Sequence, residues 1–195
     1  MKVCGLTGGI GMGKSTADKL LLSRGVPVAD TDLLAHQLVE PGQPALAEIQ
    51  NTFGKGVIAP DGTLRRDALA AIVFADGSQR VKLENILHPR IRAAWLKQIS
   101  EWKAEGKPVA VVDIPLLFET GAEKHFDAII CVACSTATQQ RRLVARGWKP
   151  EHIKQRNASQ MSVEEKIGRS TFVVWTEGTP EVDGQQLDRI LRQIN

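Results

Sequence analysis

Apolar residues gather in five short runs along the chain, at positions 3–6, 26–29, 109–112, 128–133 and 172–175. Longer stretches between these runs carry apolar residues at the three-to-four-residue spacing that is typical of amphipathic helices. A continuous apolar run is typical of a strand that is buried on both faces, as in a parallel sheet covered by helices. The pattern therefore predicts an α/β protein with a parallel sheet and helices on each side.

The interval from residue 32 to residue 107 has no convincing strand pattern. Turn signals rich in Gly and Pro divide it into segments of helical character. Leu83 and Ile86 mark one apolar helical face, and Pro89 should interrupt that helix and start the next, where Trp95 continues the helical spacing. We predict a helical insertion between the second and third strands.

Residues 8–15 read Gly-Gly-Ile-Gly-Met-Gly-Lys-Ser, which fits the phosphate-binding pattern G-x-x-x-x-G-K-[ST] in full. Glycines let the backbone turn with positive φ and approach an anion, and the helix that follows presents its N–H groups and positive dipole end. Lys14 can reach the β- and γ-phosphates, and Ser15 offers a hydroxyl to Mg²⁺. An apolar strand precedes the pattern and an amphipathic helix follows it, so a glycine-rich turn with a chance lysine is the weaker interpretation. The sequence predicts a nucleotide-binding site.

Composition and charge narrow the class of protein. Of 195 residues, 43% are hydrophobic and 24% are charged, and the net charge of +3 is too small to indicate nucleic-acid or membrane binding. No apolar run approaches the roughly 18 residues of a membrane span, and the first strand leaves no room for a signal peptide. We expect a cytoplasmic protein, a monomer or weak homo-oligomer, without nucleic-acid or membrane partners.

Three cysteines cannot form a closed disulfide framework. Cys131 and Cys134 spell C-x-x-C, but an odd offset within a strand points the two side chains to opposite faces. No second Cys/His pair completes a zinc site, so we expect packing cysteines.

Carboxylates follow two of the predicted strands, where phosphate-loop enzymes place their chemistry. Asp30 and Asp32 come after the second strand and Asp113 ends the third. Helix capping and a catalytic role are equally good interpretations of the Asp30/Asp32 pair, because Asp is a favoured N-cap residue. Asp113 occupies the usual position of the acidic residue that supports Mg²⁺, directly or through water.

A basic segment follows the fourth strand. Arg142 and Arg146 are four residues apart, so one helix face would present both guanidinium groups. Such a pair suits a lid that clamps phosphate oxygens, and a solvated basic face is the alternative.

Two absences narrow the enzyme class. The residues after Asp113 lack the glycine of a GTPase switch, and no Asn-Lys-x-Asp occurs to read guanine. No second acidic residue follows Asp113 to polarise a water, which favours transfer to an organic hydroxyl over an ATPase motor.

Several segments, in the correct order over nearly the whole chain, resemble the dephospho-CoA kinase family. They are residues 6–16, with Met12 where serine is common, Asp30-Thr31-Asp32, Leu83-Glu84 with His88-Pro89 and Arg92, residues 113–119, and Gln139, Arg142, Arg146, Gln160-Met161-Ser162 and Lys166. The tail departs from the family pattern. Ser170-Thr171 and Trp175-Thr176 stand where Ala-Asp and Asp-Asn are usual, in a region that borders the adenine.

The resemblance implies transfer of the ATP γ-phosphoryl group to the ribose 3′-hydroxyl of dephospho-CoA, with Mg²⁺ as cofactor. It implies the nucleoside-monophosphate-kinase fold: a five-stranded parallel core at 1–31, 108–136 and 167–195, a helical acceptor-binding insertion at 32–107 and a helical lid at 137–166. Asp32 would accept the 3′-hydroxyl proton and, with Lys14, would form the catalytic pair.

The resemblance also implies, position by position, which residues contact ATP, the acceptor and the metal. ATP would be bound by Gly11, Met12, Gly13, Lys14, Ser15, Thr16, Arg142 and Arg146, the acceptor by Thr7, Asp32, His88 and Leu116, and the metal by Ser15. For His88, packing or capping stays open as an alternative. Two other functions also stay open: the same fold with another small hydroxyl or nucleoside monophosphate as acceptor, and a nucleotide-dependent binding module without catalysis.

Overall fold

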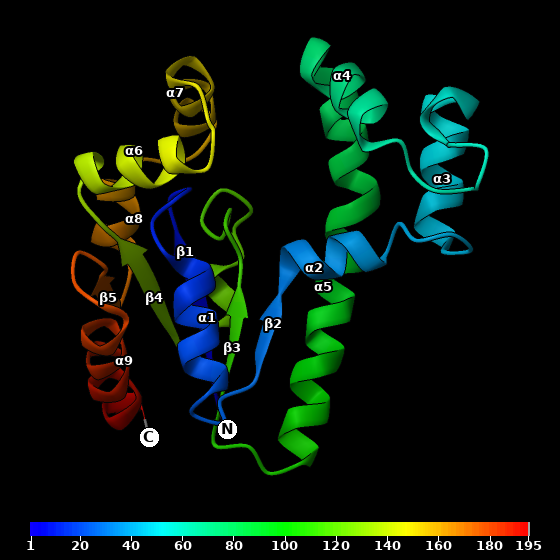
Figure 1. Ribbon diagram of the computed structural model, residues 1–195. Coiled ribbons are helices and arrows are strands. Elements are labelled where there is room, and N and C mark those ends of the chain that lie inside the picture. Colours follow the sequence, from blue (N-terminus) through cyan, green and yellow to red (C-terminus); the bar gives the residue numbers. More distant parts are fainter. Residues whose placement is uncertain (195) are drawn as a thin grey trace. The chain divides into compact units, whose positions relative to one another are not determined.

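The computed structural model describes residues 1–194, which fall into two compact units (Figure 1). One unit comprises Met1–Ala29 and Ile99–Asn195, and the other comprises Asp30–Gln98. The first unit contains the glycine-rich loop and nearly all of the sheet. The second is helical.

Five parallel strands form one sheet in the order β2-β3-β1-β4-β5 (Figure 1). The strands are β1 (Lys2–Gly8), β2 (Val28–Asp30), β3 (Val109–Asp113), β4 (Ala128–Ala133) and β5 (Phe172–Trp175). In the central strand, Leu6 pairs with Asp113 of β3 and with Ile130 of β4. Each apolar run of the sequence overlaps one strand, so the predicted α/β fold with a parallel sheet is confirmed.

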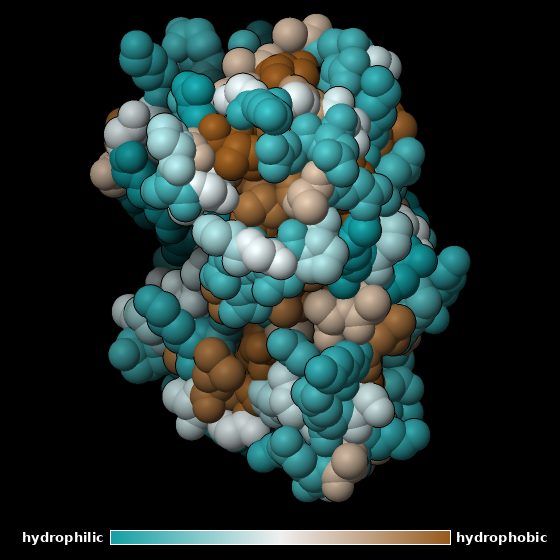
Figure 2. Space-filling model, turned by 90° about the vertical axis from the view of Figure 1, so that its right-hand side faces the viewer, coloured by the Kyte–Doolittle hydropathy of each residue, from teal (hydrophilic) through white to brown (hydrophobic). Residues whose placement is uncertain are grey.

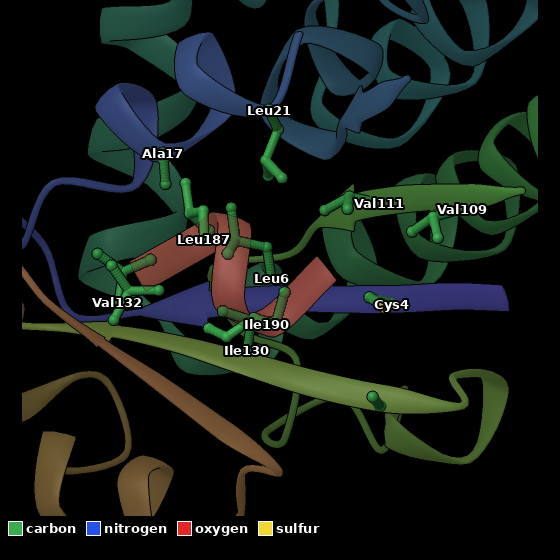
Figure 3. Packing of buried hydrophobic residues seen from close by; sticks show 12 residues of the cluster. Cys4, Leu6, Ala17, Leu21, Val109, Val111, Ile130, Val132, Leu187 and Ile190 are labelled. Atoms are coloured by element: carbon green, nitrogen blue, oxygen red, sulfur yellow. The ribbon is translucent and has the colours of Figure 1, made fainter. Parts of the chain in front are cut away.

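Within residues 1–194, five helices lie wholly in the first unit: α1 (Lys14–Leu22), α6 (Thr136–Ala145), α7 (Pro150–Ala158), α8 (Val163–Arg169) and α9 (Pro180–Ile194). A short 3-10 turn, η2 (Glu123–His125), precedes β4. Helices α1 and α9 pack on one face of the sheet, where Leu21, Leu187 and Leu6 of β1 belong to one buried cluster (Figure 3). All three side chains are fully buried, and burial of each stabilises the fold by about 1.5–3 kcal/mol. This packing holds α1 against β1, and the glycine-rich loop runs between the two elements.

The second unit contains α2 (Thr31–Gln37), α3 (Pro44–Phe53), η1 (Lys55–Val57), α4 (Arg66–Ala75) and most of α5 (Gly77–Ala104). Its own core gathers Leu46, Ile49, Val57, Leu69 and Ile86. Between residues 31 and 108, the only β pairing that the structure describes is an isolated bridge, Ile58 with Leu64. The predicted helical character of this interval is confirmed.

Pro89 does not divide two helices, as the sequence pattern predicted, but lies inside the single helix α5. A proline within a helix removes one backbone hydrogen bond and costs about 3 kcal/mol. Buried Ile86 and Trp95 anchor the helix on either side of Pro89, and this packing offsets that cost. Trp95 is a core residue with 3% exposure.

Hydrophobic side chains also reach the surface, among hydrophilic ones, on the face shown in Figure 2. Large exposed residues of α4 and α5 include Phe74, at 68% exposure, and Val81. None of the helices within residues 1–194 has both the length and the apolar character needed to cross a bilayer.

Candidate functional site

The loop between β1 and α1 takes backbone angles that only glycine adopts easily. Gly11 has φ +74° and Gly13 has φ +100°. A Cβ atom on Gly13 would lie 3.2 Å from Thr176 Oγ1, and one on Gly11 would lie 2.8 Å from Leu143 Cγ. Gly13, a glycine of the pattern, and Gly11, at one of its variable positions, are therefore required for both their backbone angles and the close packing around them.

Helix α1 begins directly after this loop and keeps its N-terminus open. Gly13 is the N-cap residue, and no side chain caps the helix. The first amides of any helix lack intrahelical acceptors, and the helix dipole adds partial positive charge at that end. Ser15, in the first turn, is exposed. This end of α1 is suited to bind an anion such as phosphate.

Lys14 lies beside Asp113 at the end of the neighbouring strand β3. The Lys14 Nζ atom is 3.7 Å from Asp113 Oδ2, and the two side chains are 16% and 7% exposed. Strand register explains the proximity, because Asp113 pairs with Leu6 of β1, just before the loop. The site thus holds one ammonium and one carboxylate group next to the loop.

Two carbonyl groups of the loop accept hydrogen bonds from buried side chains. Gln139 Nε2 donates to Ile10 O over 2.8 Å, and Thr176 Oγ1 donates to Met12 O over 2.8 Å. Gln139 is 4% exposed and Thr176 is 2% exposed. The sequence pointed to Gln139 only as a lid residue and to Thr176 only as a departure from the family pattern. Their buried contacts with the loop depend on tertiary structure and have no local sequence signal.

The two arginines of the basic segment differ in their surroundings. Arg142 Nη1 donates to Thr176 Oγ1 over 2.9 Å, and Arg142 Nη2 donates to Thr176 O over 2.6 Å. Arg146 is exposed at the C-cap of α6. The structure therefore brings Arg142, but not Arg146, into hydrogen bonding with the turn after β5.

Glu177, next to Thr176, ties the same turn to the start of α6. Its carboxylate accepts hydrogen bonds from the Ser135 backbone N–H and from Thr138 Oγ1. These hydrogen bonds favour the charged form and lower the pKa of Glu177 to about 2. The turn after β5 is thus hydrogen-bonded both to the loop and to α6.

Thr7 and Leu116, which were predicted to contact the acceptor, lie near each other in the first unit. Thr7 is fully buried, and its hydroxyl donates to Pro115 O over 3.3 Å. Buried Lys166 of α8 donates to the same oxygen over 2.7 Å and pairs with Glu119 Oε1 at 3.0 Å. Leu116 lies between these anchored residues and is half-buried. The Thr7 hydroxyl belongs to this internal hydrogen-bond network, because its single proton is donated to Pro115 O.

In the second unit, the carboxylates of Asp30 and Asp32 have different surroundings. Asp30 is the N-cap of α2, and its carboxylate accepts from the Asp32 N–H at 2.8 Å and the Leu33 N–H at 3.1 Å. Asp32 follows in the first turn and is exposed. The sequence left open which aspartate caps the helix, and the structure assigns that role to Asp30. His88 is exposed on α5.

Met12 and the cysteines are packing residues. The Met12 side chain is buried against Cys134 and Ala133, so only its backbone is available to a phosphate. Cys131 and Cys134 are free thiols, and both are buried. Burial raises the pKa of Cys131 to about 11, which keeps the thiol protonated and unreactive near neutral pH.

A family model and the curated relatives identify one family. A family model described as dephospho-CoA kinase matches residues 2–181. A dephospho-CoA kinase of Anaeromyxobacter dehalogenans is 47% identical over 195 residues, 100% of this chain and 92% of the relative. Among solved structures, TT1252 from Thermus thermophilus has a TM-score of 0.87 at 34% identity, with 100% of this chain and 98% of that chain covered. A dephospho-CoA kinase from Campylobacter jejuni has a TM-score of 0.73 at 27% identity, with 98% and 96% covered.

Proposed function

The chain belongs to the dephospho-CoA kinase family, and we propose that it transfers the γ-phosphoryl group of ATP to the ribose 3′-hydroxyl of dephospho-CoA, giving CoA and ADP. The observation that carries this proposal is the loop of residues 8–13 with the open N-terminus of α1 and Lys14, in a chain that matches the family over residues 2–181. Phosphoryl transfer depends mainly on positioning and charge neutralisation, which such a loop supplies.

ATP is proposed to bind through its phosphates at residues 11–16. The amides at the start of α1 donate hydrogen bonds, and Lys14 contributes a full positive charge to the β- and γ-phosphates. Arg142 and Arg146 are the proposed lid contacts, and residues 137–166 the lid. The anchored position of Arg142 supports a role close to the loop, whereas exposed Arg146 is the arginine that is free to reach outward.

Mg²⁺ is the proposed cofactor, and the residues at the loop fit it. Oxygen ligands suit this ion, which usually takes one or two protein ligands together with phosphates and waters. The Ser15 hydroxyl is exposed at the start of α1, and the Asp113 carboxylate lies beside Lys14. When bound with ATP, Mg²⁺ neutralises part of the phosphate charge.

Asp32 is the proposed base that accepts the proton of the acceptor hydroxyl. Its neighbour Asp30 is engaged by two backbone amides as the helix cap. Asp32 is the exposed carboxylate of the pair, at the start of the insertion 32–107 that would hold dephospho-CoA.

Thr7, His88 and Leu116 are the other proposed acceptor contacts. Leu116 has exposed surface to offer, and Thr7 would act through the segment that it hydrogen-bonds. We place the reaction in the cytoplasm and infer a monomer or weak homo-oligomer that uses small-molecule substrates only.

The direct test is ADP release from the purified chain with Mg²⁺, ATP and a panel of acceptors. Dephospho-CoA should support turnover far above the rate with nucleoside monophosphates or other small alcohols. Turnover with a different acceptor alone would favour another kinase activity in the same fold. ATP binding without transfer to any acceptor would favour a non-catalytic module.

A further inference from the structure

We propose that Thr176 and Gln139 are positioning residues for the phosphate-binding loop, which hold the carbonyl groups of Met12 and Ile10 so that the amides of Gly13 and Gly11 face bound phosphate. The proposal rests on the nucleotide-binding half of the proposed function and is independent of the acceptor. Both donors lie outside the loop, one on α6 and one in the turn after β5.

Peptide geometry links the carbonyl contacts to the amides. No peptide bond among residues 1–194 is cis. In a trans peptide the carbonyl oxygen and the following N–H point in opposite directions. Because Met12 O is directed to Thr176, the Gly13 N–H is directed away from it. The same reasoning turns the Gly11 N–H away from Gln139.

The two donors belong to one connected surface. Gln139 and Arg142 are three residues apart on α6, and Arg142 binds Thr176 through both its Nη atoms. The amides of Gly11 and Gly13 therefore point away from this surface. An arrangement of successive backbone N–H groups directed outward from a turn is what binds a phosphate.

Arg142 also orients the Thr176 hydroxyl. A threonine hydroxyl has one proton, and Oγ1 here accepts from Arg142 Nη1 at 2.9 Å while Met12 O lies 2.8 Å away. Ala133 O is farther, at 3.3 Å. Because the lone pair faces a cationic donor, the proton is directed to a carbonyl, and the charge strengthens that hydrogen bond.

A second side chain fixes Gln139 in the same way. Asn157 of α7 donates from Nδ2 to Gln139 Oε1 over 3.2 Å, which leaves Gln139 Nε2 directed to Ile10 O. Gln139 is buried, so water does not replace this partner readily. Each loop carbonyl thus has a donor that is itself held by another polar side chain.

Loss of either donor leaves a loop carbonyl without its partner and lets the peptide rotate. The loop must then be ordered at the expense of binding free energy. One net hydrogen bond corresponds to a loss of up to about tenfold in ATP affinity. We expect the Kd for Mg-ATP and the KM for ATP to rise together in Thr176→Val, with the KM for dephospho-CoA unchanged.

The experiment compares matched variants of the full chain. Thr176→Val keeps the size of the side chain and removes the hydroxyl, and Thr176→Ser keeps the hydroxyl. Gln139→Leu tests the second donor. Thr52→Val is the control, because the Thr52 hydroxyl donates to Glu48 O within α3. Calorimetry gives the Kd for Mg-ATP, and thermal melting shows whether each variant is folded.

The proposal predicts affinity near wild type for Thr176→Ser and Thr52→Val, and a loss of about tenfold for Thr176→Val and for Gln139→Leu. It also predicts that ADP shifts the ¹⁵N–¹H signals of Gly11 and Gly13 in the wild type, and that of Gly13 less in Thr176→Val. Wild-type affinity in folded Thr176→Val would overturn it, as would equal losses in the Ser and Val variants. If Thr176→Val does not fold, Gln139→Leu replaces it, and wild-type affinity of folded Gln139→Leu for Mg-ATP would overturn the proposal.

This inference and the proposed function fail in different ways. If the wild-type chain binds Mg-ATP but phosphorylates no acceptor, the proposed kinase activity is wrong and the variants still test the positioning role. If the wild-type chain binds no ATP, both are wrong.

Discussion

Lys14, at the start of helix α1, and Asp113, at the end of strand β3, form an ion pair with 3.7 Å between Nζ and Oδ2. Both side chains are largely buried, so the attraction between them is stronger than that of an exposed pair. The pair keeps an ammonium group at the loop where phosphates are proposed to bind, with a carboxylate beside it.

Lys14→Ala is expected to weaken ATP binding and to lower kcat/KM by about 10²-fold or more, since it removes a charge that stabilises the transferring phosphoryl group. Calorimetry with Mg-ATP and steady-state kinetics measure the two effects. Lys19→Ala is the control, because Lys19 is an exposed lysine on the same helix. Similar kinetics for the two variants would contradict the role of Lys14.

Asp32→Asn is expected to lower kcat by about 10²–10⁴-fold, the usual contribution of general-base catalysis. ATP should bind normally to this variant. Asp30→Asn is the matched control, since Asn also caps helices well. Its activity should stay near that of the wild type if Asp30 is only the cap seen at the start of α2. Rapid-quench kinetics separates the chemical step from product release. Near-normal turnover in Asp32→Asn would remove Asp32 as the base.

Lys166→Met is expected to lower the free energy of unfolding by on the order of 3 kcal/mol, because it breaks an ion pair in which the Lys166 side chain is fully buried. The Pro115 carbonyl loses a donor at the same time. Arg169→Met is the control on the same helix, since the Arg169–Glu123 pair is partly exposed and is worth about 1 kcal/mol or less. Urea unfolding followed by circular dichroism compares the two variants. Equal losses of unfolding free energy would show that the buried ion pair contributes no more to stability than the partly exposed one.

Glu177→Gln is expected to make the fold less sensitive to acid. In the folded chain the pKa of Glu177 is about 2, against an ordinary value of 4.5, so the unfolded chain binds the proton more readily. The stability that Glu177 contributes is therefore fully present above pH 4.5 and is lost as the pH falls toward 2. Unfolding free energies of the wild type and Glu177→Gln should converge over that window, with Glu40→Gln as a control for the loss of one charge. A constant difference across the window would contradict the lowered pKa.

The sequence predicted the features that depend on local pattern. The five strands were found because each is a continuous apolar run, and the loop was found because Gly8, Gly13 and Lys14 occur at fixed spacing. Pro89 was placed wrongly because its local effect on a helix is outweighed by tertiary packing of Ile86 and Trp95.

The rest of the site depends on contacts between residues that are far apart in the chain. Thr176 lies 164 residues from Met12, and Lys166 lies 51 residues from Pro115. No local pattern distinguishes a threonine that holds a loop carbonyl from one that faces solvent. The roles of Asp30 and Asp32 were ambiguous for another reason. Aspartate is a good helix cap at either position, and only the hydrogen bonds at the start of α2 show that Asp30 is the cap.

Identification of the phosphorylated product is the sharpest test of the proposed kinase activity. The wild-type chain is incubated with Mg²⁺, dephospho-CoA and ATP labelled in its γ-phosphate, and the products are separated by chromatography and assigned by ³¹P NMR. We predict that the label enters CoA as a phosphomonoester on the ribose 3′-oxygen, with one label for each ADP formed. Label found only in inorganic phosphate, or on another position or acceptor, would contradict it.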